Sequence, residues 1–285
     1  MDIPRTNKHK DIIVIYIMDS LTSIANLYLD ATSLVNFYTA PSWNIIKIGH
    51  GADSSLHQLA VDPMTNLGNV LKINYPMNSY KPSASIIGGI GIYASPTSIF
   101  PCNSARLSYE IFFPSDFNPV KGGKLPGLFI GPPGASGGNH VNGEASCRIM
   151  WRKNNSQGGI MTEAYVYVPT PQDTDYSSIP NESLDPVYGD SLWRGIFNYN
   201  KGAWNTVVMD LSLNTMTSGT ANHDGTLTLT INGVSQNYNK FIWTTTGTSI
   251  TGIVFDTFFG GSDSTWATPV DTSIYFKNFN LQKVA

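Results

Sequence analysis

The sequence predicts an all-β protein built as a sandwich or jelly roll of antiparallel sheets, and three observations support this. From Trp43 onward, short apolar runs alternate with groups of Gly, Pro, Asn and Ser, which is typical of many short strands joined by turns. No long helical period follows residue 45. Charged residues make up only 13% of the 285 residues, against roughly 25% in an average globular protein, so side chains that build exposed helices are scarce.

The first 40 residues are the least regular part of the chain. Asp19 is placed to cap a short helix whose apolar face would contain Leu21, Ile24, Leu27 and Tyr28. The apolar run at residues 12–18 is far shorter than the roughly 20 residues that span a membrane. It is also short for the apolar part of a signal peptide. We therefore predict no membrane span, and the chain has no clear signal peptide.

Several strands are predicted after this point, from runs rich in aromatic and β-branched residues that end at turn residues. They lie at residues 106–113, 145–151, 163–168, 226–231, 253–259 and 273–281. Asn232-Gly233 follows the fourth of them and is the strongest short signal for a hairpin. The Pro-rich, acidic stretch at 169–189 predicts a long surface loop. Loops of this length often form the lid or rim of a site, although a plain insertion explains it equally well.

Two of the predicted strands present polar side chains on one face. Because successive side chains of a strand point to opposite sides, Ser146 and Arg148 share a face, and so do Tyr165 and Tyr167. Lys124 lies between two Gly-containing pairs, which predicts a tight turn that holds the lysine at a fixed point. Taken alone, a solvated loop lysine and an exposed aromatic strand face explain this pattern more simply.

Charge and cysteine content narrow the possible partners. A net charge of −3 gives no sign of nucleic-acid binding. A polyanionic substrate then requires a local basic cleft, and the cations close enough in sequence to form one are Lys121, Lys124, Arg148, Arg152 and Lys153. The histidine and cysteine spacings match no metal motif, so we predict no metal and no cofactor. Cys102 and Cys147 permit a disulfide, although a buried free thiol is at least as good an explanation at Cys147.

An ordered set of motifs extends this interpretation. It consists of residues 75–80 (YPMNSY), 91–93 (GIY), 113–128 (FPSDFNPVKGGKLPGL), 146–152 (SCRIMWR), 163–169 (EAYVYVP), 189–195 (GDSLWRG), 202–205 (GAWN), 258–261 (FFGG) and 275–279 (YFKNF). Together they resemble polysaccharide lyase family 14, whose members include enzymes of Chlorella viruses and marine molluscs. We therefore expect residues 71–285 to form a lyase-like jelly-roll domain and residues 1–70 to form an N-terminal extension.

The resemblance implies a β-jelly roll that cleaves alginate or glucuronan within the polymer. The essential lysine of the family corresponds to Lys124, its strand serine and arginine to Ser146 and Arg148, and its tyrosine pair to Tyr165 and Tyr167. We further predict that the substrate is contacted by Arg152, Glu163, Trp193 and Arg194. Trp193 and the turn at 152–159 depart from the family pattern, which bears on substrate choice.

These residue types suit β-elimination. Such a lyase removes the C5 proton of a uronate, and a cation beside the carboxylate stabilises the intermediate. Arg148 can grip a carboxylate with two hydrogen bonds, and Ser146 can add a third. Lys124 and the tyrosines would supply the base and the acid, with the division of roles left open. Since lysine and tyrosine both have reference pKa values near 10, we expect an alkaline pH optimum.

Two other interpretations remain at this point. The chain could be a non-catalytic jelly roll, either a carbohydrate-binding module or a virion-associated structural protein, because fold alone does not determine function. A glycoside hydrolase would need two facing carboxylates, for which Glu110, Glu144 and Glu163 are available. Under the lyase interpretation the partner is an acidic polysaccharide, and the protein acts outside the cell or on the virion. The oligomeric state is left open.

Overall fold

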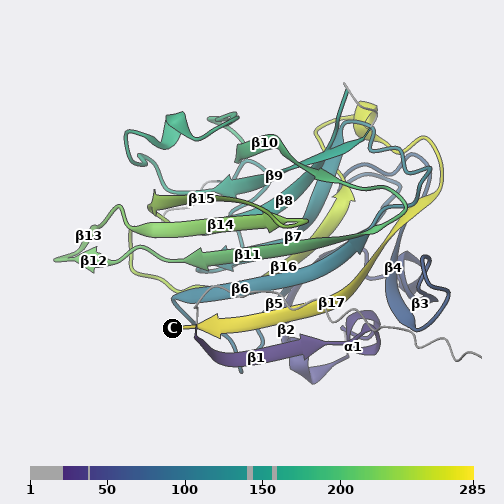
Figure 1. The fold of residues 1–285 in the computed structure, drawn as a ribbon, viewed down its shortest axis with the longest axis horizontal. Coiled ribbons are helices and arrows are strands. Elements are labelled where there is room, and N and C mark those ends of the chain that lie inside the picture. Colours follow the sequence, from purple (N-terminus) through teal and green to yellow (C-terminus); the bar gives the residue numbers. More distant parts are fainter. Residues whose placement is uncertain (1–21, 38, 140–143, 156–158) are drawn as a thin grey trace, which may run out of the picture.

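The computed structural model describes residues 22–37, 39–139, 144–155 and 159–285. In this part of the chain, two antiparallel sheets pack face to face as a jelly roll, which confirms the predicted fold class (Figure 1). A two-stranded hairpin of β12 (Met216–Thr217) and β13 (Thr220–Ala221) projects from one end. Helices are short: α1 (Ala31–Val35) and the 3-10 turns Pro41–Trp43, Ser54–Leu56, Tyr176–Ser178 and Ser264–Trp266.

One sheet has eight strands in the order β15-β14-β11-β6-β17-β4-β3, with β1 also paired to β17. Their bounds are β1 Ser23–Leu29, β3 His57–Val61, β4 Asn69–Tyr75, β6 Ser104–Phe112, β11 Trp204–Ser212, β14 Gly225–Ile231, β15 Val234–Phe241 and β17 Thr272–Val284. The Asn232-Gly233 hairpin joins β14 to β15 as predicted, with φ values of 50° and 81° at its two central residues.

The second sheet has seven strands in the order β10-β9-β8-β7-β16-β5-β2. Their bounds are β2 Ile45–His50, β5 Ile90–Ala94, β7 Gly122–Ile130, β8 Ala145–Lys153, β9 Ile160–Tyr167, β10 Asp190–Tyr199 and β16 Ile250–Phe259. All six strands predicted from the sequence are therefore present, three in each sheet, with ends shifted by up to three residues.

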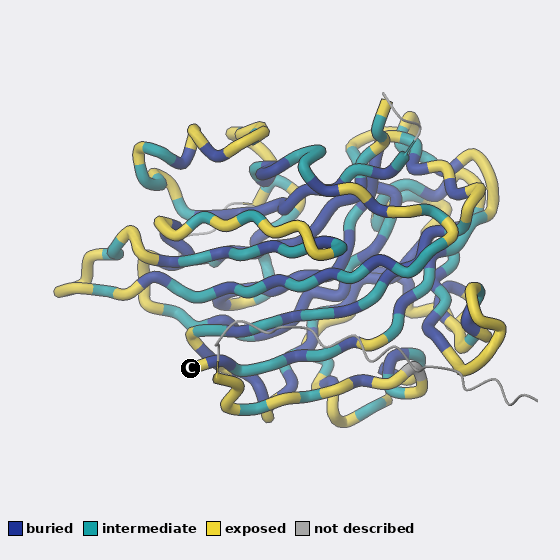
Figure 2. The backbone as a smooth tube through the Cα atoms, in the orientation of Figure 1, coloured by how far each residue is buried: buried dark blue, intermediate teal, exposed yellow. Residues whose placement is uncertain are grey.

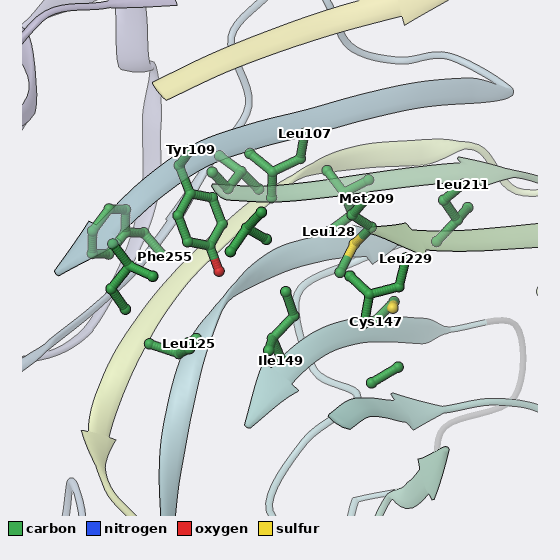
Figure 3. Packing of buried hydrophobic residues seen from close by; sticks show 14 of the residues in the cluster. Leu107, Tyr109, Leu125, Leu128, Cys147, Ile149, Met209, Leu211, Leu229 and Phe255 are labelled. Atoms are coloured by element: carbon green, nitrogen blue, oxygen red, sulfur yellow. The ribbon is translucent and has the colours of Figure 1, made fainter. Parts of the chain in front are cut away.

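The core fills the space between the sheets. Figure 3 shows Cys147 and Ile149 of β8 facing Met209 of β11 and Leu229 of β14, and all four side chains are fully buried. Buried residues follow the central strands, while exposed ones gather in the loops and in the β12–β13 hairpin (Figure 2). Burial of this apolar area, at about 25 cal/mol per Å², is the main force that holds the two sheets together.

The N-terminal segment differs from the expectation. The helix expected from Asp19 is wrong where the structure describes it, because Ser23–Leu29 is the strand β1, paired with β17. Its buried side chains follow a period of two, with Leu29 buried and Ile24 and Tyr28 exposed. The predicted boundary at residue 70 stays a prediction, although β1, β2 and β3 pair with strands of both sheets. None of the helices in the described ranges is long and apolar enough to cross a membrane.

The predicted turn around Lys124 is also wrong. Residues 122–130 form the strand β7, and its glycines serve close packing between strands instead. A Cβ on Gly123 would lie 2.0 Å from the Trp151 ring, and one on Gly127 would lie 1.9 Å from the Cys147 carbonyl oxygen. Lys124 is thus fixed by pairing with Met150 of β8 and Phe258 of β16. Cys102 and Cys147 are both free, buried thiols.

The packing at Gly123 gives a stability prediction. The substitution Gly123→Ala forces the new methyl group against the fully buried Trp151 ring, and overpacking of this kind costs about 1–3 kcal/mol. We expect a lower urea midpoint of unfolding. Gly159→Ala is the matched control, since no atom of the described residues lies within 4 Å of its added Cβ. Equal midpoints for the two variants would contradict this account of the glycine.

Candidate functional site

A cavity of about 600 Å³ lies on the face of the seven-stranded sheet that points away from the core. Strands β7, β8, β9, β10 and β16 all contribute side chains to its lining: Lys124, Arg148, Met150, Arg152, Tyr165, Tyr167, Ser191, Arg194, Asp256 and Phe258. It brings together four cationic side chains from strands that are separate in sequence. Lys81, from the loop between β4 and β5, adds a fifth cation to the lining.

Strand alternation explains this concentration of polar groups. Arg148, Met150 and Arg152 occupy every second position of β8 and line the cavity, while the residues between them point into the core. Tyr165 of β9 lies directly opposite Arg148 in the strand register, and Tyr167 lies opposite Ser146. The i, i+2 pairs predicted from the sequence therefore do share one face.

Lys124 is partly buried beside a sulfur atom and an aromatic ring. Its Nζ lies 2.7 Å from the Met150 sulfur and 3.2 Å from the centre of the Tyr165 ring. Among the described residues, no carboxylate lies within ion-pair distance of it. Burial, followed by the positive charges of Arg148 and Arg152, lowers its pKa well below 10.5. Lys124 is therefore suited to act as a neutral amine and accept a proton.

Arg148 forms the floor of the cavity and is 3% exposed. Its Nη1 donates to Asp256 Oδ2 at 3.2 Å. Its Nε and Nη2 atoms are buried and have no hydrogen-bond partner within the described part of the chain. These two donors form one edge of the guanidinium plane, the edge that binds a carboxylate through two parallel hydrogen bonds. A buried, half-satisfied cation of this kind is prepared for an anionic ligand.

The two tyrosines stand beside these cations. Their rings are 5.8 Å apart in an edge-to-face arrangement, and the Arg148 guanidinium lies 5.8 and 5.6 Å from their centres. The Tyr165 hydroxyl accepts a hydrogen bond from the Gly189 amide at 3.1 Å. Burial, with the neighbouring Tyr167 second, raises the pKa of Tyr165 above 10.0. Tyr165 therefore keeps its proton and is suited to donate it.

Not every predicted site residue reaches the cavity. Ser146 is buried beneath it and donates to the Ala135 carbonyl at 2.7 Å, so it anchors the neighbouring loop. Trp193 is fully buried and packs edge-on against Phe197 in the core. A β-bulge after Leu192 and a φ of 60° at Trp193 itself turn this part of β10 inward.

The long loop predicted at 169–189 runs along the cavity. Ser183, Asp185, Tyr188 and Gly189 all belong to the lining. The close approach of Gly189 to the Tyr167 ring, 2.6 Å from an added Cβ, leaves no room for a larger residue there. The Gly189 amide is also the partner of the Tyr165 hydroxyl. The loop therefore forms a rim that positions the tyrosines.

Sequence reasoning missed Asp256 and His50. Asp256 lies on the predicted strand at 253–259, where a lone carboxylate among apolar residues was the available signal. It pairs with Arg148, and His50 Nδ1 lies 3.7 Å from its other oxygen. Burial lowers the pKa of His50, which disfavours the charged imidazole. No group of three metal-ligating side chains is found in the part of the chain that the structure describes.

The family model described as polysaccharide lyase 14 matches residues 64–279. The exolysin of Paramecium bursaria Chlorella virus 1 is 28% identical over 196 residues, which cover 64% of this chain and 30% of that protein. The chain thus spans less than a third of the length of this relative. The PL-14 alginate lyase from Aplysia kurodai has a similar structure, with a TM-score of 0.75, 28% identity and coverage of 91% of this chain and 98% of that one.

Two further structures extend the comparison. An alginate lyase from Chlorella virus has a TM-score of 0.73 and 27% identity, covering 92% of this chain and 100% of that one. An endo-β-1,4-glucuronan lyase from Trichoderma reesei has a TM-score of 0.55 and 11% identity, with coverage of 92% and 96%. At this low identity the glucuronan lyase supports the shared fold alone.

The surroundings of Lys124 predict an unusual titration. We expect the Lys124 amine to lose its proton at a pH well below 10.5, the ordinary pKa of lysine. The measurement is the ¹³Cε chemical shift of isotope-labelled lysines across a pH series. In Arg148→Gln the Lys124 midpoint should move upward, because one of the repelling cations is removed. A Lys124 midpoint at or above 10.5 would contradict the proposed neutral amine.

Proposed function

The chain belongs to the polysaccharide lyase 14 family, and from this premise we propose that it cleaves an acidic polysaccharide, a polyuronate, by β-elimination. The observation that supports this most directly is the unpartnered Nε and Nη2 edge of Arg148 at the floor of the cavity. This edge is closed to solvent in the structure, and a uronate carboxylate that reaches it would complete it with two charge-assisted hydrogen bonds. Alginate, the substrate named for two similar structures, is the first polymer to test.

The binding of the carboxylate prepares the sugar for reaction. The C5 proton lies next to the carboxyl group and is weakly acidic while that group stays negatively charged. Arg148 offsets this charge and stabilises the additional charge that develops when the proton leaves. Its own burial strengthens the effect, since the interaction takes place in a medium of low dielectric constant.

Lys124 and Tyr165 divide the proton transfers between them. The neutral Lys124 amine takes the C5 proton, the electron pair forms the C4–C5 double bond, and the bond from C4 to the linking oxygen breaks. The leaving oxygen then takes the hydroxyl proton of Tyr165. The Gly189 amide already donates to this hydroxyl oxygen and stabilises the phenolate that forms. The opposite pKa shifts of the two groups support this assignment.

A glycoside hydrolase is less consistent with the site. Of the three carboxylates considered for that role, Glu163 is fully buried and is bound by Arg152 and Arg194. It is therefore not available to protonate a glycosidic oxygen or to activate water. The non-catalytic alternative, a binding or virion-associated jelly roll, differs from the proposal in turnover alone and is decided by the next experiment.

The first test is product formation. With alginate or glucuronan, the chain should produce an unsaturated uronate, followed by its ultraviolet absorbance. Lys124→Ala should lower the rate by about 10²–10⁴-fold, the usual contribution of a general base. Lys153→Ala removes the same type of side chain at an exposed position of β8 and should leave the rate unchanged. Release of reducing ends without this absorbance would indicate a hydrolase, and binding without either product a non-catalytic protein.

The pH dependence tests the division of roles. The base must be deprotonated, so the rate should rise as pH passes the lowered pKa of Lys124, well below 10.5. The acid must keep its proton, so the rate should fall only as pH approaches the raised pKa of Tyr165, above 10.0. We expect kcat/KM to form a broad plateau between these two pKa values. The rise on the acid side of the plateau should occur at a lower pH than the reference pKa of lysine implies. A rate that peaks in acid would contradict both assignments.

A further inference from the structure

Glu163 organises one end of the cavity without lining it. Its carboxylate is fully buried in β9. Oε1 accepts hydrogen bonds from Arg152 Nε at 2.9 Å and Nη2 at 2.7 Å, and from Ser191 Oγ at 2.9 Å. Oε2 accepts one from Arg194 Nε at 2.6 Å. Arg194 Nη2 donates in turn to Ser191 Oγ at 2.7 Å. A single carboxylate thus holds two guanidinium groups from β8 and β10.

The two arginines keep donors for a ligand. Both line the cavity, and Nη1 of each has no hydrogen-bond partner among the residues that the structure describes. Two positive charges share one negative charge, so a positive charge remains unbalanced. Because Glu163 already fixes both side chains, a ligand would bind them without a further loss of rotamer freedom.

The two anchoring carboxylates lie on different sides of β8. In the strand order β10-β9-β8-β7-β16, Arg148 is paired with Asp256 of β16, whereas Arg152 is paired with Glu163 of β9. Arg148 and Arg152 are four residues apart on the same face, which is about 13 Å along a strand, and Met150 lies between them. The two arginines are thus separated along β8, and their carboxylate partners lie on opposite sides of this strand.

We propose that Arg152 and Arg194, positioned by Glu163, form a second carboxylate subsite that binds another uronate of the same chain while Arg148 holds the reacting one. This inference rests on the proposed function and deepens it, because it specifies a substrate with charged carboxylates on more than one sugar. Glu163 is then a positioning residue that makes no contact with the substrate, which revises its predicted role. Trp266 lines the same end of the cavity, with the Arg152 guanidinium 5.6 Å from its ring centre.

The test is binding in a chain that does not turn over. Isothermal titration calorimetry on Lys124→Ala would compare an alginate tetrasaccharide with its carboxyl-reduced counterpart, in which each carboxylate is a primary alcohol. Adding Arg194→Gln should weaken binding of the charged tetrasaccharide about 10-fold, the usual cost of losing a hydrogen bond to a charged group. Binding of the reduced compound should not change. Glu163→Gln should have the same effect, since both arginines lose their anchor.

Controls separate this subsite from general charge and from misfolding. Lys153→Gln removes the same charge one residue beyond Arg152, at an exposed position, and should leave both affinities unchanged. Arg194→Gln leaves Glu163 paired with Arg152, so this variant keeps the test valid should Glu163→Gln unfold. In a chain that keeps Lys124, Arg194→Gln should raise KM for the polymer with little change in kcat.

The results that would overturn the second subsite differ from the result that would overturn the proposed function. Equal weakening of the charged and reduced tetrasaccharides, or a tetrasaccharide affinity that Arg194→Gln leaves unchanged, would overturn the second subsite. The same is true if Lys153→Gln weakens binding as much as Arg194→Gln. A chain that forms no unsaturated product would contradict the proposed lyase, whereas the affinities, which are measured without turnover, report separately on whether the second carboxylate subsite exists.

Discussion

The site depends on the alternation of side chains along β8 and β9. In each strand one set of residues closes the core between the sheets, and the other set lines the cavity. The register is therefore fixed twice, by apolar packing on one side and by the pairing of Arg148 with Asp256 and of Arg152 with Glu163 on the other. A shift by one residue would move Cys147 and Ile149 into the cavity and bury the arginines against apolar side chains. Stability of the fold and placement of the cations are consequences of the same register.

The site is rich in positive charge although the whole chain carries a net negative charge. The protein has a net charge of −3, yet five cationic side chains line one cavity. These positive charges would repel one another, but two buried or nearly buried carboxylates offset them. Asp256 pairs with Arg148, and Glu163 pairs with both Arg152 and Arg194. Lys124 has no such partner among the described residues. Burial, followed by the positive charges of Arg148 and Arg152, lowers its pKa.

The sequence predicts what is local and misses what depends on distant partners. The strands, the Asn232-Gly233 hairpin, the shared face of Ser146 and Arg148 and that of Tyr165 and Tyr167 follow from periodicity within a few residues, and the structure contains them. The glycines around Lys124 were assigned to a turn, because the Trp151 ring that requires them belongs to another strand. The helix expected from Asp19 overlaps Ser23–Leu29, which forms a strand instead because its partner β17 lies at the other end of the chain. The role of Asp256 could not be predicted, because Arg148 is 108 residues away.

One physical effect produces both halves of the proposed acid–base pair. Lysine and tyrosine have similar reference pKa values, near 10, and in water neither would serve as base and acid near neutral pH. Burial favours the neutral form of each group. For Lys124 the neutral form is the one without the proton, and for Tyr165 it is the one with the proton. Desolvation in one cavity therefore prepares a base and an acid together, 3.2 Å apart from ammonium to ring centre, without a histidine or a free carboxylate in either role. The neighbouring Arg148 lowers the pKa of both groups, but burial is the largest effect on each, so the pKa of Tyr165 remains raised.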